Sequence, residues 1–209
     1  MYDQAIEFLN KDAVLARFIQ TVDPKKNLMV TPSSGAADVY FTLLESIVSQ
    51  QLSVKASDTI FQRFISLYPA NYPSAELLFG TETEKLRSVG LSFQKAAYLK
   101  NVAAFALNND LSYETLNQFS DEEIISLLTQ IKGVGRWTVE MLLMFTMNRP
   151  DVFPYDDLVI RNNIIKLYQI EGKGAELKKK IFSVAENWRP YRTLACKYIW
   201  KWKDTFLAE

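Results

Sequence analysis

One stretch decides how this sequence of 209 residues folds: Ile131-Lys132-Gly133-Val134-Gly135-Arg136-Trp137-Thr138. Apolar residues recur at helical spacing before it, and the segment 139–147 after it is apolar on almost every side. The two glycines allow a turn with positive φ and a close approach by another molecule. Because backbone N–H groups at the start of a helix bind anions, the stretch predicts a turn between two helices that is suited to a phosphate of DNA. Taken alone, the spacing fits a plain turn between two packed helices equally well.

The rest of the chain also predicts helices. Apolar residues at 39–48 and 124–131 follow the helical period, whereas alternating strand patterns are nearly absent. The segment 139–147 is expected to be a central, buried helix. Residues 24–35 predict an extended connection, so we expect an N-terminal helix and linker, 1–35, packed on a core, 36–209, that acts as one functional unit. The predicted fold class is all-α.

Composition limits the chemistry. The sequence has 24 Lys and Arg, 24 Asp and Glu and no His, so it has no net charge and no imidazole base. The single cysteine, Cys196, excludes a disulfide within the chain, a thiolate zinc site and an iron–sulfur cluster. There is no signal-peptide pattern, and no apolar run approaches the roughly 20 residues that cross a bilayer. We expect a cytoplasmic monomer with no membrane partner.

Charge is nevertheless distributed unevenly. From Lys173 to Lys203 basic residues far outnumber the two acidic ones, Glu176 and Glu186, whereas the segment 110–126 is acidic and has no basic residue. This asymmetry can form a positive face on a neutral molecule, as contact with nucleic acid requires.

A second motif is Asp151-Val152-Phe153-Pro154-Tyr155-Asp156-Asp157-Leu158, which ends in two acids that open another helix. The commonest role of an aspartate at such a place is to cap the helix. With two acids in a row, one can cap or orient while the other does chemistry.

The order of hairpin, buried helix, short loop and aspartate resembles the helix-hairpin-helix DNA glycosylase superfamily. The two motifs together resemble bacterial 3-methyladenine DNA glycosylase II, and three further stretches agree: 47–53, 188–192 and 198–200. The resemblance covers residues 36–203 and implies a two-lobed helical fold with a cleft between the lobes. Two departures are expected: Lys132 stands where the family usually has proline, and the N-terminal β-containing domain of longer members has no counterpart here.

The resemblance implies a monofunctional glycosylase of base excision repair. Such an enzyme flips an alkylated purine, such as 3-methyladenine or 7-methylguanine, out of damaged duplex DNA and hydrolyses its N-glycosidic bond, leaving an abasic site. Asp157 would stabilise the positive charge that develops on the sugar. A cationic base suits an aromatic pocket, to which the resemblance assigns Trp137 and Trp200, with Asp156 beside them. Trp137 replaces the lysine of lyase-competent members, so no strand cleavage is expected.

DNA contacts are expected at the hairpin and at a wedge. Gln51 and Leu52 resemble the wedge that fills the gap left by a flipped base, although Leu52 would otherwise be interpreted as a core leucine. Phosphate contacts are expected along 189–203, whereas Lys178-Lys179-Lys180 is interpreted as a solvated helix face. The expected hairpin contacts are Lys132, Gly133, Val134, Gly135, Arg136 and Thr138. No cofactor is required, but the resemblance places a monovalent cation on the carbonyls of Thr129, Ile131 and Val134.

Other functions stay open at this point. One is a glycosylase for another lesion, such as uracil, hypoxanthine or an oxidised purine. A second is a DNA-binding helix-hairpin-helix module without catalysis, which the acids Asp156 and Asp157 disfavour because carboxylates facing phosphates weaken binding. A third is a helical scaffold with no nucleic-acid role. Trp188 and Trp202 are interpreted as core residues.

Overall fold

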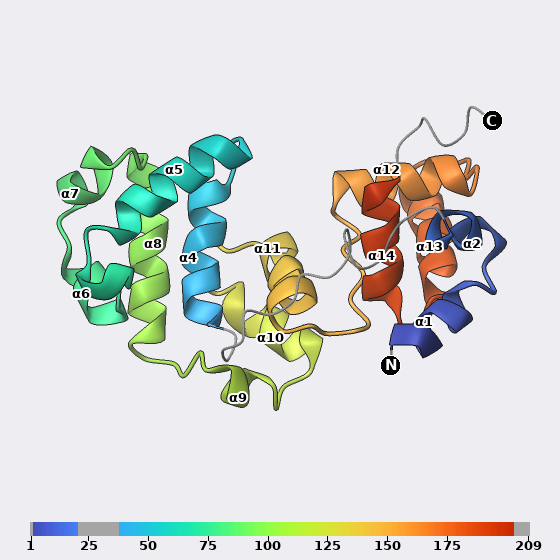
Figure 1. Ribbon diagram of the computed structural model, residues 1–209, viewed down its shortest axis with the longest axis horizontal. Coiled ribbons are helices and arrows are strands. Elements are labelled where there is room, and N and C mark those ends of the chain that lie inside the picture. The colour runs from blue at the N-terminus through green and yellow to red at the C-terminus, as the bar shows by residue number, and fades with distance from the viewer. Residues whose placement is uncertain (1, 21–37, 203–209) are drawn as a thin grey trace. The chain divides into compact units, whose positions relative to one another are not determined.

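The computed structural model describes residues 2–20 and 38–202, and within them all regular structure is helical (Figure 1). The all-α prediction is therefore confirmed. The described chain forms two compact units, which we call the central unit, 38–147, and the terminal unit, 2–20 with 148–202. The connection expected at 24–35 and the last basic residue, Lys203, lie outside the described residues.

The central unit contains helices α4 (Val39–Ser49), α5 (Val54–Ile65), α6 (Ala75–Gly80), α7 (Thr83–Ser88), α8 (Phe93–Ala106), α9 (Tyr113–Leu116), α10 (Asp121–Leu128) and α11 (Arg136–Met141). A 3-10 turn at Pro69–Asn71 and a π-helical turn at Leu142–Thr146 complete it. The terminal unit contains α1 (Tyr2–Leu9), α2 (Ala13–Ile19), α12 (Leu158–Leu167), α13 (Gly174–Glu186) and α14 (Arg192–Lys201).

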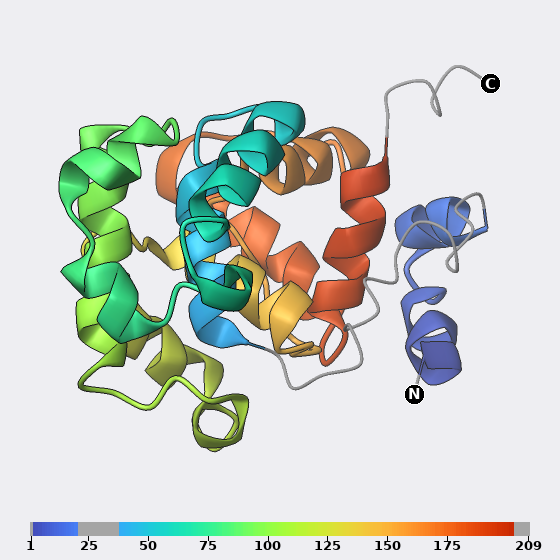
Figure 2. The same ribbon diagram turned by 60° about the vertical axis from the view of Figure 1, so that its left-hand side comes forward.

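Helix α8 lies at the centre of the packing in the central unit, since it contacts both α4 and α6 (Figures 1 and 2). The apolar stripe of α4 is fully buried, with Leu43, Leu44 and Ile47 in the core, and Leu99 and Val102 of α8 are equally inaccessible. Burial of one such leucine or isoleucine contributes about 1.5–3 kcal/mol to folding. The apolar stripe is therefore the main source of stability for α4.

The predicted buried helix 139–147 is confirmed. Val139, Leu142, Leu143 and Met144 are all in the core. The helix starts earlier than its apolar residues, at Arg136, and its last turn widens to a π-helix in which the Met147 N–H donates to the Leu142 carbonyl at 3.0 Å. The hairpin is thereby joined directly to the core of the central unit.

The terminal unit unites the two ends of the described chain. The hydroxyls of Tyr2 and Tyr198 lie 2.8 Å apart, and the Asp12 carboxylate accepts hydrogen bonds from the Tyr168 hydroxyl at 2.7 Å and the Trp188 indole N–H at 3.0 Å. Helices α1 and α2 therefore pack on the C-terminal helices, and residues 148–202 form a unit with them rather than with 38–147. Trp188 and Trp202 are buried, as expected.

Candidate functional site

The predicted hairpin connects α10 to α11. Helix α10 ends at Leu128 with Thr129 as its C-cap, and α11 begins at Arg136 with Gly135 as its N-cap. Only one of the two glycines adopts positive φ, namely Gly133 at +110°, whereas Gly135 is extended at −95°. Apart from Gly135 itself and its chain neighbours, no described residue has an atom within 4 Å of where a Cβ on Gly135 would stand. The space around the start of α11 is thus open at the Cβ position of Gly135.

Helix α8 contacts the hairpin at its turn, through Tyr98 and Asn101. A Cβ built on Gly133 would lie 2.3 Å from Cγ of Tyr98, so only glycine fits against that ring. One turn further along α8, Asn101 Nδ2 donates to the Lys132 carbonyl at 3.0 Å. From α4, Gln50 Nε2 donates to the Gly133 carbonyl at 3.2 Å. The hairpin turn is therefore fixed by three side chains that the motif itself does not contain.

The hairpin has two exposed basic residues, Lys132 and Arg136, which differ in their partners. Arg136 forms salt bridges to Glu122 of α10 at 2.5 Å and to buried Glu140 of α11 at 2.9 Å, and these hydrogen bonds, Glu122 first, raise its pKa. Arg136 thus ties the two helices of the hairpin together. The Glu122 pair is exposed, and such pairs contribute only about 0–1 kcal/mol to stability.

The predicted wedge lies in the turn between α4 and α5. The Leu52 N–H donates to the Ser49 carbonyl at 3.1 Å, Gln51 has a φ of +58°, and Ser53 caps α5. Leu52 is 39% exposed. That exposure rules out the alternative interpretation of Leu52 as a core leucine.

A hollow of about 400 Å³ brings the wedge and the hairpin helix together within the central unit. It contains three predicted site residues, Gln51, Trp137 and Thr138, and Trp137 is 44% exposed. The other lining residues were not predicted; they are Ser46, Ser49, Gln50 and Met141. Ser46 and Ser49 are three residues apart, so polar residues beside the apolar stripe of α4 were a usable signal.

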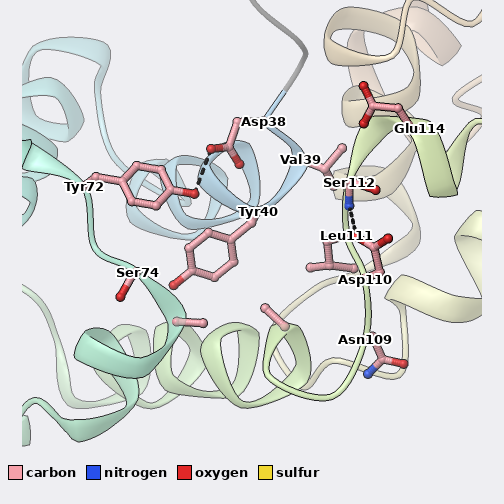
Figure 3. Close-up of a pocket in the computed structure, with 12 residues that line it drawn as sticks. Asp38, Val39, Tyr40, Tyr72, Ser74, Asn109, Asp110, Leu111, Ser112 and Glu114 are labelled. Carbon is pink, nitrogen blue, oxygen red and sulfur yellow. Dashed lines mark hydrogen bonds between the residues drawn. The ribbon is translucent and has the colours of Figure 1, made fainter.

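A larger hollow of about 520 Å³ in the central unit contains none of the predicted residues (Figure 3). Its wall includes the carboxylates of Asp38, Asp110 and Glu114. The Tyr72 hydroxyl donates to Asp38 at 2.9 Å, and burial, followed by Asp38, raises the pKa of Tyr72 to about 12. A negatively charged wall repels phosphate, so this hollow is no candidate for DNA binding.

In the terminal unit, hydrogen bonds fix the side chain of Asp157. Its side chain is nearly buried, it is the N-cap of α12, and its Oδ1 accepts from the Ile160 N–H at 2.9 Å and the Trp200 indole N–H at 3.0 Å. Asp156 is exposed. Capping therefore falls to Asp157, the same residue to which the resemblance assigns catalysis, and a role of Asp156 in orienting it stays a prediction. Trp200, which belongs to α14, lies beside Asp157.

Residues at and just before the start of α14 fix the loop that leads to Asp157. Arg192 Nε donates to the Asp151 carboxylate at 2.7 Å, and Arg189 pairs with the same carboxylate at 2.7 Å. Thr193 Oγ1 donates to the Arg149 carbonyl at 2.6 Å and accepts from the Val152 N–H at 3.0 Å. Two arginines that were expected to bind phosphate thus serve first to fix this loop.

Two further properties concern residues 2–20 and 38–202. None of their helices is long and apolar enough to cross a membrane. Nor do these residues gather three or more His, Cys, Asp or Glu side chains that could hold a metal ion.

Comparison with known proteins places this arrangement in a family. Residues 44–190 match the HhH-GPD superfamily base excision DNA repair protein model, and the chain belongs to that family. It is 40% identical over 164 residues to DNA-3-methyladenine glycosylase 1 of Schizosaccharomyces pombe, covering 78% of this chain and 71% of that protein. It is 30% identical over 177 residues to the putative DNA-3-methyladenine glycosylase YfjP of Bacillus subtilis, covering 82% and 61%.

Solved structures agree with these relatives. The 3-methyladenine DNA glycosylase of Schizosaccharomyces pombe in complex with abasic DNA has a TM-score of 0.78 at 35% identity, with 95% of each chain covered. The DNA-3-methyladenine glycosidase of Bacillus halodurans has a TM-score of 0.78 at 32% identity, with 97% of this chain and 89% of that one covered. The helix-hairpin-helix glycosylase resemblance is confirmed.

Proposed function

We propose that the protein is a monofunctional DNA glycosylase that removes alkylated purines, such as 3-methyladenine and 7-methylguanine, from damaged duplex DNA. The observation that carries this proposal is the buried carboxylate of Asp157, held at the start of α12 by the indole N–H of Trp200. Relatives named as DNA-3-methyladenine glycosylases support the same substrate class.

The geometry of Asp157 suits stabilisation of a positive sugar. Breaking an N-glycosidic bond passes through an oxocarbenium-like transition state, which a preoriented carboxylate stabilises without reorganisation. The hydrogen bonds from Ile160 and Trp200 fix the Asp157 carboxylate at the start of α12. An alkylated purine is already cationic and leaves without a strong general acid, in keeping with a sequence that lacks histidine.

Aromatic side chains support recognition of a cationic base. Trp200 stands beside the Asp157 carboxylate, and Trp137 lines the 400 Å³ hollow of the central unit. A well-placed cation–π contact contributes about 1–2 kcal/mol, which favours a charged alkylated base over a neutral one. Asp156 is exposed, so its assignment to the base pocket stays a prediction.

Release of bases tests the proposal. Purified protein is incubated with methylated duplex DNA, and freed 3-methyladenine and 7-methylguanine are detected by chromatography. Parallel duplexes containing uracil or hypoxanthine test the alternative lesions. Binding without release of any base would identify a non-catalytic DNA-binding module instead.

The hairpin is proposed to hold the DNA backbone. The start of α11, open at the Cβ position of Gly135, and exposed Lys132 suit a phosphate. The carbonyls of Thr129, Ile131 and Val134 are neutral oxygen donors of the kind that a monovalent cation takes, although the Ile131 carbonyl also accepts from the Val134 N–H at 2.9 Å. When bound, such a cation would add positive charge at the phosphate site. Action as a cytoplasmic monomer stays a prediction.

The product is predicted to be an intact strand with an abasic site. Trp137 offers no amine for a Schiff base, so borohydride added during the reaction should trap no covalent protein–DNA adduct. Gel electrophoresis of labelled DNA with and without borohydride measures this. An adduct would contradict the prediction, and its loss in Lys132→Gln would identify Lys132 as the amine.

Leu52→Ala is predicted to slow excision in a context-dependent way. Holding a base outside the stack costs a few kcal/mol unless a side chain fills the gap. Single-turnover excision should therefore fall most for a lesion in a stable pair and less for one opposite a mismatch. Because Leu52 is 39% exposed, the free energy of unfolding should change by only about 0.5 kcal/mol.

The matched control is Leu77→Ala, which truncates an exposed leucine of α6. It should excise the lesion from both duplexes at the wild-type rate. Equal slowing of Leu52→Ala on matched and mismatched lesions, with a stability loss of about 2–5 kcal/mol, would show that Leu52 acts through packing.

A further inference from the structure

One face of α8 contacts both DNA-binding loops proposed above. Lys95, Tyr98 and Asn101 follow one another at spacings of three residues, so their side chains emerge on the same side of the helix. Lys95 contacts the wedge turn, Tyr98 lies against Gly133, and Asn101 binds the Lys132 carbonyl. The wedge turn and the hairpin thus both pack against a single helix, α8.

The wedge turn is conformationally strained. Gln50 has φ −49° and ψ 129°, Gln51 has φ +58°, and the Leu52 N–H closes the turn on the Ser49 carbonyl. These values describe a type II turn, in which the third residue is normally glycine. A glutamine there persists only where the surroundings determine the backbone. Something must therefore hold this turn in place.

The Lys95 ammonium supplies that restraint. Its Nζ donates to the Val48 carbonyl at 2.7 Å and to the Gln50 carbonyl at 2.8 Å, on either side of the point where α4 ends. No carboxylate among the described residues forms an ion pair with it, and burial lowers its pKa. Charge-assisted bonds to carbonyls are stronger than neutral ones, and here two converge on one turn.

The restrained turn is also linked to the hairpin. Gln50, whose carbonyl Lys95 binds, donates its side-chain amide to the Gly133 carbonyl at 3.2 Å. Displacing the Gln50 backbone would therefore move both the wedge side chain of Leu52 and the hydrogen bond to the hairpin.

We propose that Lys95 is a positioning residue for base flipping, which fixes the strained turn so that Leu52 is presented in register with the hairpin. The inference rests on the proposed function for its consequence in catalysis. The restraint itself is a property of the free protein and can be tested without substrate.

The first test uses hydrogen exchange on the free protein. Lys95→Met keeps the aliphatic stem and removes the ammonium, and it should raise the exchange rate of the Leu52 amide by about tenfold or more, since bonds to charged groups are lost. The core amides of Leu99 and Val102 should be unchanged. Lys100→Met, on the same helix, is the control, and Lys95→Arg should restore protection because a guanidinium can donate to both carbonyls.

The second test measures single-turnover excision. Lys95→Met should slow release of a lesion from a stable pair by about tenfold and release from a mismatch much less. Combined with Leu52→Ala it should add little, because both changes remove the same insertion step.

These outcomes separate the two proposals. Wild-type exchange at Leu52 in Lys95→Met would overturn the restraint, whatever the enzyme does. Equal slowing on both duplexes, or full additivity with Leu52→Ala, would overturn the positioning role while the restraint stands. A wild-type protein that releases no base would overturn the proposed function and leave the exchange result intact.

Discussion

Asp157→Asn is expected to lower the single-turnover rate of base excision by about a hundredfold or more. The change removes the negative charge that stabilises the developing sugar cation. An asparagine oxygen can still accept the hydrogen bonds from Ile160 and Trp200, so the cap of α12 should persist and the melting temperature should stay close to that of the wild type.

DNA binding by Asp157→Asn is expected to be unchanged or tighter, because one charge that repels phosphate is gone. Asp3→Asn is the matched control: it makes the same change in an exposed residue of α1 in the same unit, and it should excise at the wild-type rate. Retention of more than about a tenth of the wild-type rate by Asp157→Asn would remove Asp157 from the mechanism.

Gly133→Ala is expected to destabilise the hairpin and abolish tight DNA binding. The added Cβ would lie 2.3 Å from the Tyr98 ring, and a φ of +110° is unfavourable for alanine. Overpacking and backbone strain together should lower the free energy of unfolding by about 2–5 kcal/mol. Denaturant unfolding and affinity for a duplex with an abasic site measure the two effects.

Two further variants separate clash from strain. Gly135→Ala is the control for stability, since Gly135 is extended and open space surrounds its Cβ position, so its unfolding midpoint should match the wild type. Gly133→Ala combined with Tyr98→Ala should recover part of the hairpin's DNA affinity, because it removes the ring contacts at 2.3 and 2.6 Å, while the contact with the Cβ of residue 98 at 2.7 Å and the backbone strain remain. Equal stability of Gly133→Ala and Gly135→Ala would show that the close approach to Tyr98 does not affect the free energy of unfolding.

The sequence by itself determined the features that depend on local pattern. Helical spacing of apolar residues predicted the all-α fold and the buried helix after the hairpin, because burial of one face imposes the period. Resemblance in the motifs 133–138, 151–158 and 198–200 identified the family and assigned Asp157 and Trp200, whose Oδ1 and Nε1 atoms lie 3.0 Å apart.

Only the tertiary structure decided which partners the charged and polar side chains take. Arg136 and Arg192 were interpreted as phosphate ligands, yet each meets a carboxylate, Glu122 or Asp151, that lies 14 or 41 residues away. Lys95 gave no signal, because its partners are backbone carbonyls, which every residue possesses and which no sequence pattern distinguishes. Periodicity specifies which face of a helix is buried, but the packing of helices distant in the chain determines what each remaining side chain meets.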